Sequence, residues 1–87
     1  MGKNTPQDIE TIVKDQYLVG KRHAQICDAA IKLFSKKGFH QTSVREIAET
    51  CGLGIGTLYS YIKTKEDILC LVYRRILEIF EARMLAA

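Results

Sequence analysis

The side chains best suited to binding another molecule lie in one stretch near the middle of the chain, from Val44 to Ile62, which reads VREIAETCGLGIGTLYSYI. Its second half carries hydroxyl groups and glycines but no acidic residue. Hydroxyl and backbone N–H groups donate hydrogen bonds to phosphate oxygens, whereas a polyanion repels a carboxylate. This stretch is therefore suited to the phosphate-lined groove of a nucleic acid duplex. The positions expected to face outward are Ile55, Gly56, Thr57, Tyr59, Ser60 and Tyr61.

Catalysis and metal binding lack the residues that they need. No carboxylate pair or nucleophile–base set stands out, so we do not expect an enzyme. Cys27, Cys51 and Cys70 lie far apart with no C-x-x-C pair, and neither histidine has a partnering cysteine. We therefore expect no metal site, no cofactor and no disulfide framework, and free thiols of this kind are typical of a reducing cytoplasm.

Basic residues are concentrated in the same middle part of the chain. Residues 21–65 carry eight lysines and arginines against three acidic residues, while the flanking segments each carry a slight excess of acids. This favours a polyanionic partner, and a solvated surface with a mild basic bias is the alternative. No apolar run follows the N-terminus, and charged residues interrupt the apolar stretch from Ile68 to Leu85, so neither a signal peptide nor a membrane span is expected.

Helices are predicted to position this surface. Ser43 and Glu46 form the S-x-x-E pattern of a capping box, which starts a helix over residues 44–51. Gly52 can take the positive φ that lets the chain turn, and a second short helix is expected over residues 55–62. Two helices joined by a tight turn containing glycine make the helix-turn-helix pattern.

Longer helices flank this pair. Apolar residues at helical spacing predict a helix from Lys21 to Lys37, and a last helix runs from Lys65 to near the end. No segment alternates with period two, which excludes obvious strands. We therefore predict an all-α fold, a homeodomain-like three-helix bundle with a long fourth helix.

The N-terminal residues leave two alternatives open. Thr5 and Pro6 can start a short extra helix that ends near Leu18 to Gly20, or the segment is a mobile arm. The predicted organisation is an N-terminal extension (1–20), a helix-turn-helix domain (21–66) and a linking helix (67–87).

The last helix carries more apolar residues than a single stripe needs. The surplus must pack against chain that is missing here or against a second copy. An alternative function follows from it, namely a protein–protein interaction module that touches no DNA.

From about His23 to Leu69 the chain resembles the DNA-binding domain of TetR/AcrR-type bacterial transcriptional regulators. The ordered combination of short matches is what makes the resemblance specific. The matching segments are I-x-D-A-A-x-x-L-F at 26–34, K-K-G-F at 36–39, T-S-V-R-E-I-A at 42–48, G-L-G-I-G-T-L-Y at 52–59 and K-T-K-E-D-I-L at 63–69.

The resemblance implies that the helix at 55–62 is the recognition helix in the major groove and that the helix before it crosses the DNA backbone. It implies close approach to DNA at Gly56, a base or thymine-methyl contact from Thr57, and phosphate contacts from Tyr59, Tyr61 and Lys65. Of the two tyrosines, we expect Tyr59 to pack its ring while its hydroxyl reaches a phosphate. The full set of expected DNA contacts is Thr42, Ser43, Arg45, Gly54, Ile55, Gly56, Thr57, Tyr59, Ser60, Tyr61, Lys65, Lys21 and Arg22. For Lys21 and Arg22 two alternatives remain: an arm that reaches flanking phosphates, or a solvated helix start.

Two positions depart from the commonest form of the family. Ile55 stands where a lysine is frequent, and Ile62 stands where an aromatic residue is usual. The first change removes a phosphate-binding charge, so shape and thymine-methyl contacts are expected to contribute more to specificity.

The resemblance also implies a cytoplasmic repressor that forms a homodimer on a palindromic operator, with half-sites separated by whole turns of about 34–36 Å. A small-molecule effector is implied only for a C-terminal domain, which this sequence does not encode.

Overall fold

A computed structural model describes residues 14–86 of the chain. Four α-helices make up this part, and no strand occurs within it. The helices are α1 (Gln16–Lys37), α2 (Val44–Cys51), α3 (Ile55–Tyr59) and α4 (Lys65–Ala86). The predicted all-α fold is thereby confirmed. The short helix predicted from Thr5 and Pro6 begins outside the described residues.

The first helix begins earlier than predicted. Asp15 caps α1, because its Oδ1 accepts hydrogen bonds from the backbone N–H groups of Tyr17 at 3.0 Å and Leu18 at 3.2 Å. Val19 is already buried in the core, so residues 16–20 belong to α1 and the helix start expected at about residue 21 is wrong. The Asp15 cap and the buried Val19 outweigh the low helix propensity of Gly20, so the helix continues through it.

The turn between α2 and α3 follows the predicted chemistry. Ser43 and Glu46 form both hydrogen bonds of the capping box at the start of α2. Gly52 ends α2 with φ 77°, a left-handed conformation that glycine adopts without steric cost. The third helix is shorter than the expected 55–62, because residues beyond Tyr59 form a turn that leads into α4.

The core lies where α1 packs against α2 and α4, and α3 joins it mainly through α2. Its most deeply buried large side chains come from every element: Ile26 from α1, Ile47 from α2, Leu58 from α3 and Ile68 from α4. Ile62, in the turn after α3, is buried with them. An aliphatic side chain is thus accommodated where the family commonly has an aromatic one.

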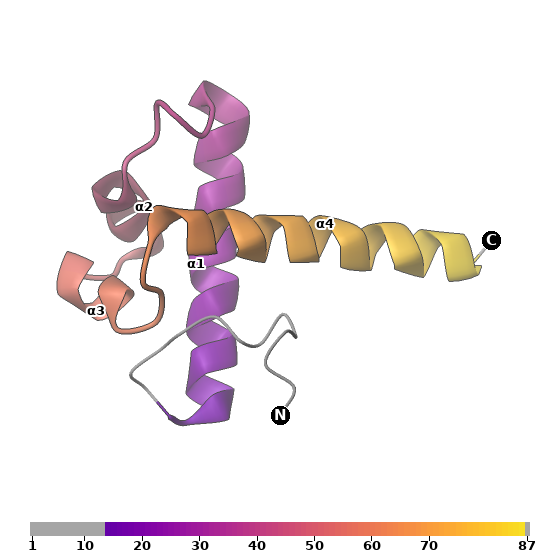
Figure 1. Ribbon diagram of the computed structural model, residues 1–87, viewed down its shortest axis with the longest axis horizontal. Helices are drawn as coiled ribbons and strands as arrows, with labels where there is room; N and C mark the ends of the chain where they lie inside the picture. Colours follow the sequence, from indigo (N-terminus) through magenta and orange to yellow (C-terminus); the bar gives the residue numbers. More distant parts are fainter. Residues whose placement is uncertain (1–13, 87) are drawn as a thin grey trace.

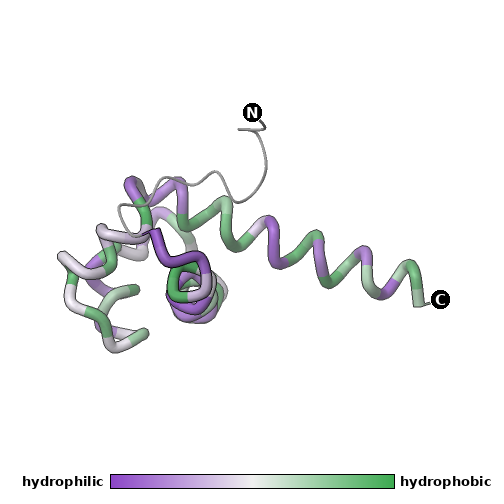
Figure 2. Tube along the Cα trace, turned by 90° about the horizontal axis from the view of Figure 1, so that it is seen from below, coloured by the Kyte–Doolittle hydropathy of each residue, from purple (hydrophilic) through white to green (hydrophobic). Residues whose placement is uncertain are grey.

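The fourth helix crosses α1 and then leaves the bundle. Figure 1 shows α4 extending beyond the other three helices toward the C-terminus. Only its first turns contribute to the core, through Ile68, Leu71 and Val72. Hydrophobic residues recur between hydrophilic ones along its projecting part in Figure 2, and those exposed there include Ile76, Phe80 and Leu85. Among the described residues, no helix is long and apolar enough to span a membrane.

Candidate nucleic-acid interface

The third helix presents an outward surface without negative charge. Leu58 points inward and is fully buried, which fixes the opposite side of α3 toward solvent. Gly56, Thr57 and Tyr59 are exposed there, and Ile55 is partly exposed. Gly54 precedes the helix and is also exposed. These residues lie next to one another on the exposed side of α3 and at its start.

The two tyrosines take the opposite places from those expected. Tyr59 is 44% exposed, whereas Tyr61 is only 5% exposed and belongs to the core. The expectation that Tyr59 packs its ring is therefore wrong. The physical reason is the early end of α3: the turn after Tyr59 directs the side chains of Tyr61 and Ile62 inward. Tyr59 is thus the tyrosine available at the surface.

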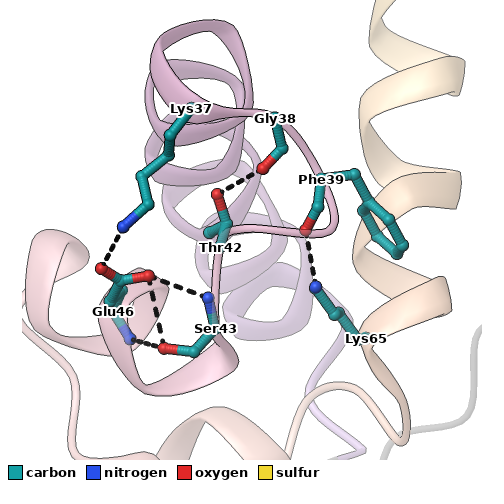
Figure 3. A network of polar contacts seen from close by, with 7 residues as sticks. All are labelled: Lys37, Gly38, Phe39, Thr42, Ser43, Glu46 and Lys65. Carbon is teal, nitrogen blue, oxygen red and sulfur yellow. Dashed lines mark hydrogen bonds and ion pairs between the residues drawn. The ribbon is translucent and has the colours of Figure 1, made fainter.

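The loop between α1 and α2 is held by its own polar groups, as Figure 3 shows. The Thr42 hydroxyl donates a hydrogen bond to the Gly38 carbonyl at 2.7 Å, and Thr42 is only 2% exposed. The Thr42 hydroxyl is thus turned into the loop and away from solvent, and the DNA contact expected at this position stays a prediction. Ser43 is exposed, but its hydroxyl accepts the hydrogen bond from the N–H of Glu46 at 3.1 Å.

An ion pair closes the same network. The Lys37 ammonium lies 2.5 Å from a carboxylate oxygen of Glu46, whose other oxygen accepts a hydrogen bond from the N–H of Ser43. The hydrogen bond from Lys37, followed by the one from Ser43, holds the pKa of Glu46 below its ordinary value. The one acid in the first turn of α2 is thereby neutralised by a neighbour and kept in a capping role.

The Lys65 ammonium is already bound within the protein. Its Nζ donates a hydrogen bond to the Phe39 carbonyl at 2.6 Å and lies 4.2 Å from the centre of the Phe39 ring (Figure 3). Thr64 and Asp67 cap the start of α4 reciprocally. The backbone N–H groups of Lys63 and Thr64 donate to the Asp67 carboxylate, and the Thr64 hydroxyl accepts a hydrogen bond from the N–H of Asp67 at 3.2 Å. Lys65 therefore ties the α1–α2 loop to α4, a structural role that its sequence position did not reveal. An ammonium has three donors, so two N–H groups of Lys65 remain for further acceptors.

The remaining expected contacts divide by exposure. Arg45 is exposed, and it makes no ion pair with Glu49 or any other acid in the described part of the chain, so its charge stays available. Ser60 is partly buried, and its hydroxyl donates to the Gly56 carbonyl at 3.3 Å. This hydrogen bond braces the end of α3.

Lys21 and Arg22 lie within α1 rather than in an arm. Lys21 is exposed. Arg22 is partly buried, its Nη1 donates to the Gln25 side chain at 2.7 Å, and its Nε is buried without a partner among the described residues. Both residues lie inside the regular helix α1, so they do not form the arm that was one of the two alternatives.

One further polar contact reaches the region after α3 from α1. The Nε2 atom of His23 lies 2.8 Å from the backbone carbonyl oxygen of Tyr61. A carbonyl can only accept, so Nε2 carries the proton. The expected set of site residues did not include His23. The signal that could have found it is a polar residue in the apolar stripe of α1, between Val19 and Ile26.

Other chemistry finds no support in the described residues. No group of three or more His, Cys, Asp or Glu residues is placed to hold a metal ion within residues 14–86. Burial raises the pKa of both Cys27 and Cys51, which keeps their thiols protonated and poorly reactive. The candidate interaction surface is the exposed α3 face with its neighbours at the starts of α2 and α4.

Comparison with known proteins agrees with this geometry. Residues 26–70 match the family of bacterial regulatory proteins of the tetR type. The HTH-type transcriptional regulator HbdR of Aromatoleum sp. (strain CIB) is 35% identical over 81 residues, which cover 93% of this chain and 35% of the relative. The fatty acid metabolism regulator protein of Bacillus subtilis (strain 168) is 40% identical over 63 residues, which cover 72% of this chain and 32% of the relative.

The chain spans about a third of the length of these curated relatives. No solved structure matches it at a comparable level of similarity. The family match covers a little more than half of the chain, and it contains α2, α3 and the turn between them. The chain therefore belongs to the TetR family of bacterial transcriptional regulators, a family of DNA-binding proteins rather than enzymes, and it carries the family's N-terminal helix-turn-helix domain.

Proposed function

We propose that this chain binds duplex DNA in a sequence-dependent manner, with α3 inserted into the major groove. The observation that carries the proposal is the exposed face of α3, which presents Gly56, Thr57 and Tyr59 without any acidic side chain. A helix of this width fits the major groove, where base edges can be distinguished. Thr57 is the exposed residue on this face best placed to contact DNA bases, through its hydroxyl to a base edge or through its methyl group to a thymine methyl.

The neighbouring elements supply the contacts that orient α3. Ser43 and Arg45 lie at the start of α2, where a helix that crosses the backbone meets phosphates. Tyr59 offers an exposed phenol to a phosphate on the other side, and Lys65 adds a charge at the start of α4. Phosphate contacts of this kind fix the register of the protein, whereas base contacts determine the sequence that it prefers.

The functions of a longer protein extend this proposal. We infer that regulation is by repression, that two copies bind a palindromic operator, and that a small molecule releases them by binding a further domain. Such a protein acts in the cytoplasm, where bacterial DNA lies. The apolar side chains on the projecting half of α4 are consistent with such additional structure, because they remain uncovered in this chain.

Binding to random-sequence duplex at several salt concentrations tests the basic proposal. We expect affinity to fall steeply with salt, because each phosphate contact releases counterions and contributes about 0.9 to the slope of log K against log salt. Arg45→Ala provides a variant of an exposed residue that should lower both affinity and slope. Salt-independent binding, or no binding at low salt, would contradict a DNA-binding role.

The second candidate is a protein-binding module that uses α4. The observation in its favour is the row of exposed Tyr73, Leu77 and Phe80 on this helix. The same titration separates the two functions. A module that binds only protein leaves the duplex unbound at every salt concentration, and substitution of Phe80 by a polar residue alters its self-association.

A further inference from the structure

His23 occupies an unusual place in α1. It lies on the core-facing side of the helix, four residues after Val19 and four before Cys27, both of which are buried. Such a stripe normally consists of apolar residues, because a polar group removed from water costs free energy unless it is hydrogen-bonded. The imidazole is satisfied by the Tyr61 carbonyl, to which Nε2 donates at 2.8 Å. The contact joins residues 38 positions apart in sequence.

The Tyr61 carbonyl belongs to the turn that ends the recognition helix. The backbone N–H groups of Tyr61 and Ile62 both donate to the Leu58 carbonyl, at 2.9 and 3.2 Å, which continues α3 by one irregular turn. The next two N–H groups, of Lys63 and Thr64, are held by Asp67 of α4. His23 thus ties this connection to α1 at Tyr61, and Asp67 ties it to α4 at Lys63 and Thr64.

The third helix depends on such outside contacts. It has only five residues, and its N-cap, Gly54, provides no side-chain hydrogen bond. A helix of this length is not stable alone, so packing and neighbouring polar groups determine its orientation. Packing through Leu58 fixes its depth in the bundle, and a directional hydrogen bond at its C-terminal end limits rotation about that contact.

We propose that His23 is a positioning residue for DNA recognition, which holds the C-terminal turn of α3 against α1 and so sets the direction in which Thr57 and Tyr59 face the DNA. This inference rests on the proposed function, because the orientation of α3 matters only if α3 contacts DNA. His23 itself does not contact the DNA. Its effect passes through the backbone of Tyr61.

Two substitutions separate the hydrogen bond from the space that the ring fills. His23→Leu fills the space of the ring with an apolar side chain of similar size but leaves the Tyr61 carbonyl without its donor. His23→Gln places a side-chain amide N–H within similar reach and should restore the contact. Loss of a hydrogen bond of ordinary strength corresponds to roughly a fivefold change in an equilibrium constant.

Cys27→Ala is the matched control. Cys27 lies one turn further along the same side of α1, is uncharged, and donates through Sγ to the Leu71 carbonyl of α4 at 3.5 Å. This substitution also removes a contact from α1 and lowers stability, but it leaves the turn after α3 untouched. Measurements are made at a temperature at which all variants are folded by circular dichroism.

The experiment measures affinity for a duplex selected from a random pool, together with hydrogen exchange of the Tyr61 and Ile62 amides. We expect His23→Leu to bind about fivefold more weakly and to exchange these amides several-fold faster, while His23→Gln and Cys27→Ala stay within about twofold of the wild type in both measurements. Equal losses for His23→Leu and Cys27→Ala, or no rescue by His23→Gln, would overturn the positioning role.

The same experiment distinguishes the inference from the proposed function. Absence of duplex binding by the wild type would refute the proposed function and, with it, a role for His23 in DNA recognition. Normal binding by the wild type and by His23→Leu, in a folded protein, would refute only the inference.

Discussion

Gly56 offers the clearest separation between folding and DNA binding. It is the second residue of α3 and is exposed, and a Cβ atom added there meets no atom within 4 Å. Its φ is not in the left-handed region, so the backbone does not require glycine. We therefore expect Gly56→Ala to fold well and yet to bind DNA less tightly.

The two effects have opposite signs and can be estimated. Alanine in place of glycine stabilises a helix by about 0.5–1 kcal/mol, which corresponds to a rise in Tm of roughly 2–8 °C in a domain of this size. If DNA approaches the backbone of Gly56 closely, the extra methyl group costs about 1–3 kcal/mol of binding free energy, as in other tightly packed contacts. Affinity should then fall by roughly 5- to 150-fold.

Gly20→Ala is the control for this prediction. Gly20 lies within α1, is exposed, and also has no atom within 4 Å of an added Cβ, but it lies outside the α3 surface. We expect a similar rise in Tm and no loss of affinity. Thermal unfolding by circular dichroism and duplex binding by fluorescence anisotropy provide the two measurements. Unchanged or tighter binding by Gly56→Ala would refute the idea that DNA approaches α3 at this residue.

Substitutions in α3 and in the polar contacts of α2 and α4 test the contribution of single side chains. Lys65→Ala should weaken binding to all duplexes and lower the slope of log K against log salt by about 0.9. It should also reduce Tm, because the Phe39 carbonyl loses its donor. A lower Tm with unchanged affinity and slope would leave Lys65 a purely structural role. Thr57→Ala should leave Tm unchanged and relax preference at one base pair by about 1–3 kcal/mol in a repeated selection, and an identical selected sequence would rule out its base contact. Tyr59→Phe should weaken binding to selected and random duplexes equally at constant Tm, so full affinity would show that its hydroxyl binds no phosphate. Lys37 and Ser43 hold the pKa of Glu46 below its ordinary 4.5, so the stability that this carboxylate contributes is present above that pH and is lost as the pH falls through the lower folded-state value. Glu46→Gln should therefore lose less stability on acidification than the wild type in denaturant titrations. An unchanged acid response would contradict the contribution of Glu46.

The elements that the sequence specifies locally could be predicted well. Ser43 and Glu46 encode the start of α2, and Gly52 encodes its end, since both signals act within a few residues. The start of α1 could have been found in the same way, because Asp15 is a good N-cap residue. The glycine at position 20 is tolerated within this helix, which is capped at Asp15 and held to the core by the buried Val19.

Contacts between distant residues could not be predicted from spacing. The hydrogen bond from Lys65 to the Phe39 carbonyl and the one from His23 to the Tyr61 carbonyl join residues far apart in sequence. Their acceptors are backbone carbonyls, which no residue type marks. The exchange of roles between Tyr59 and Tyr61 has a related cause, since it depends on the residue at which α3 ends. Helix ends are the least certain feature of any pattern-based prediction.

Whether the exposed face of α3 reads base pairs can be measured by selecting bound duplexes from a random pool. We expect repeated rounds with this chain to enrich a short common sequence, and we expect Thr57→Ala to broaden this sequence at one position. A pool that remains random after repeated rounds, although the chain binds duplex tightly, would contradict base recognition by α3.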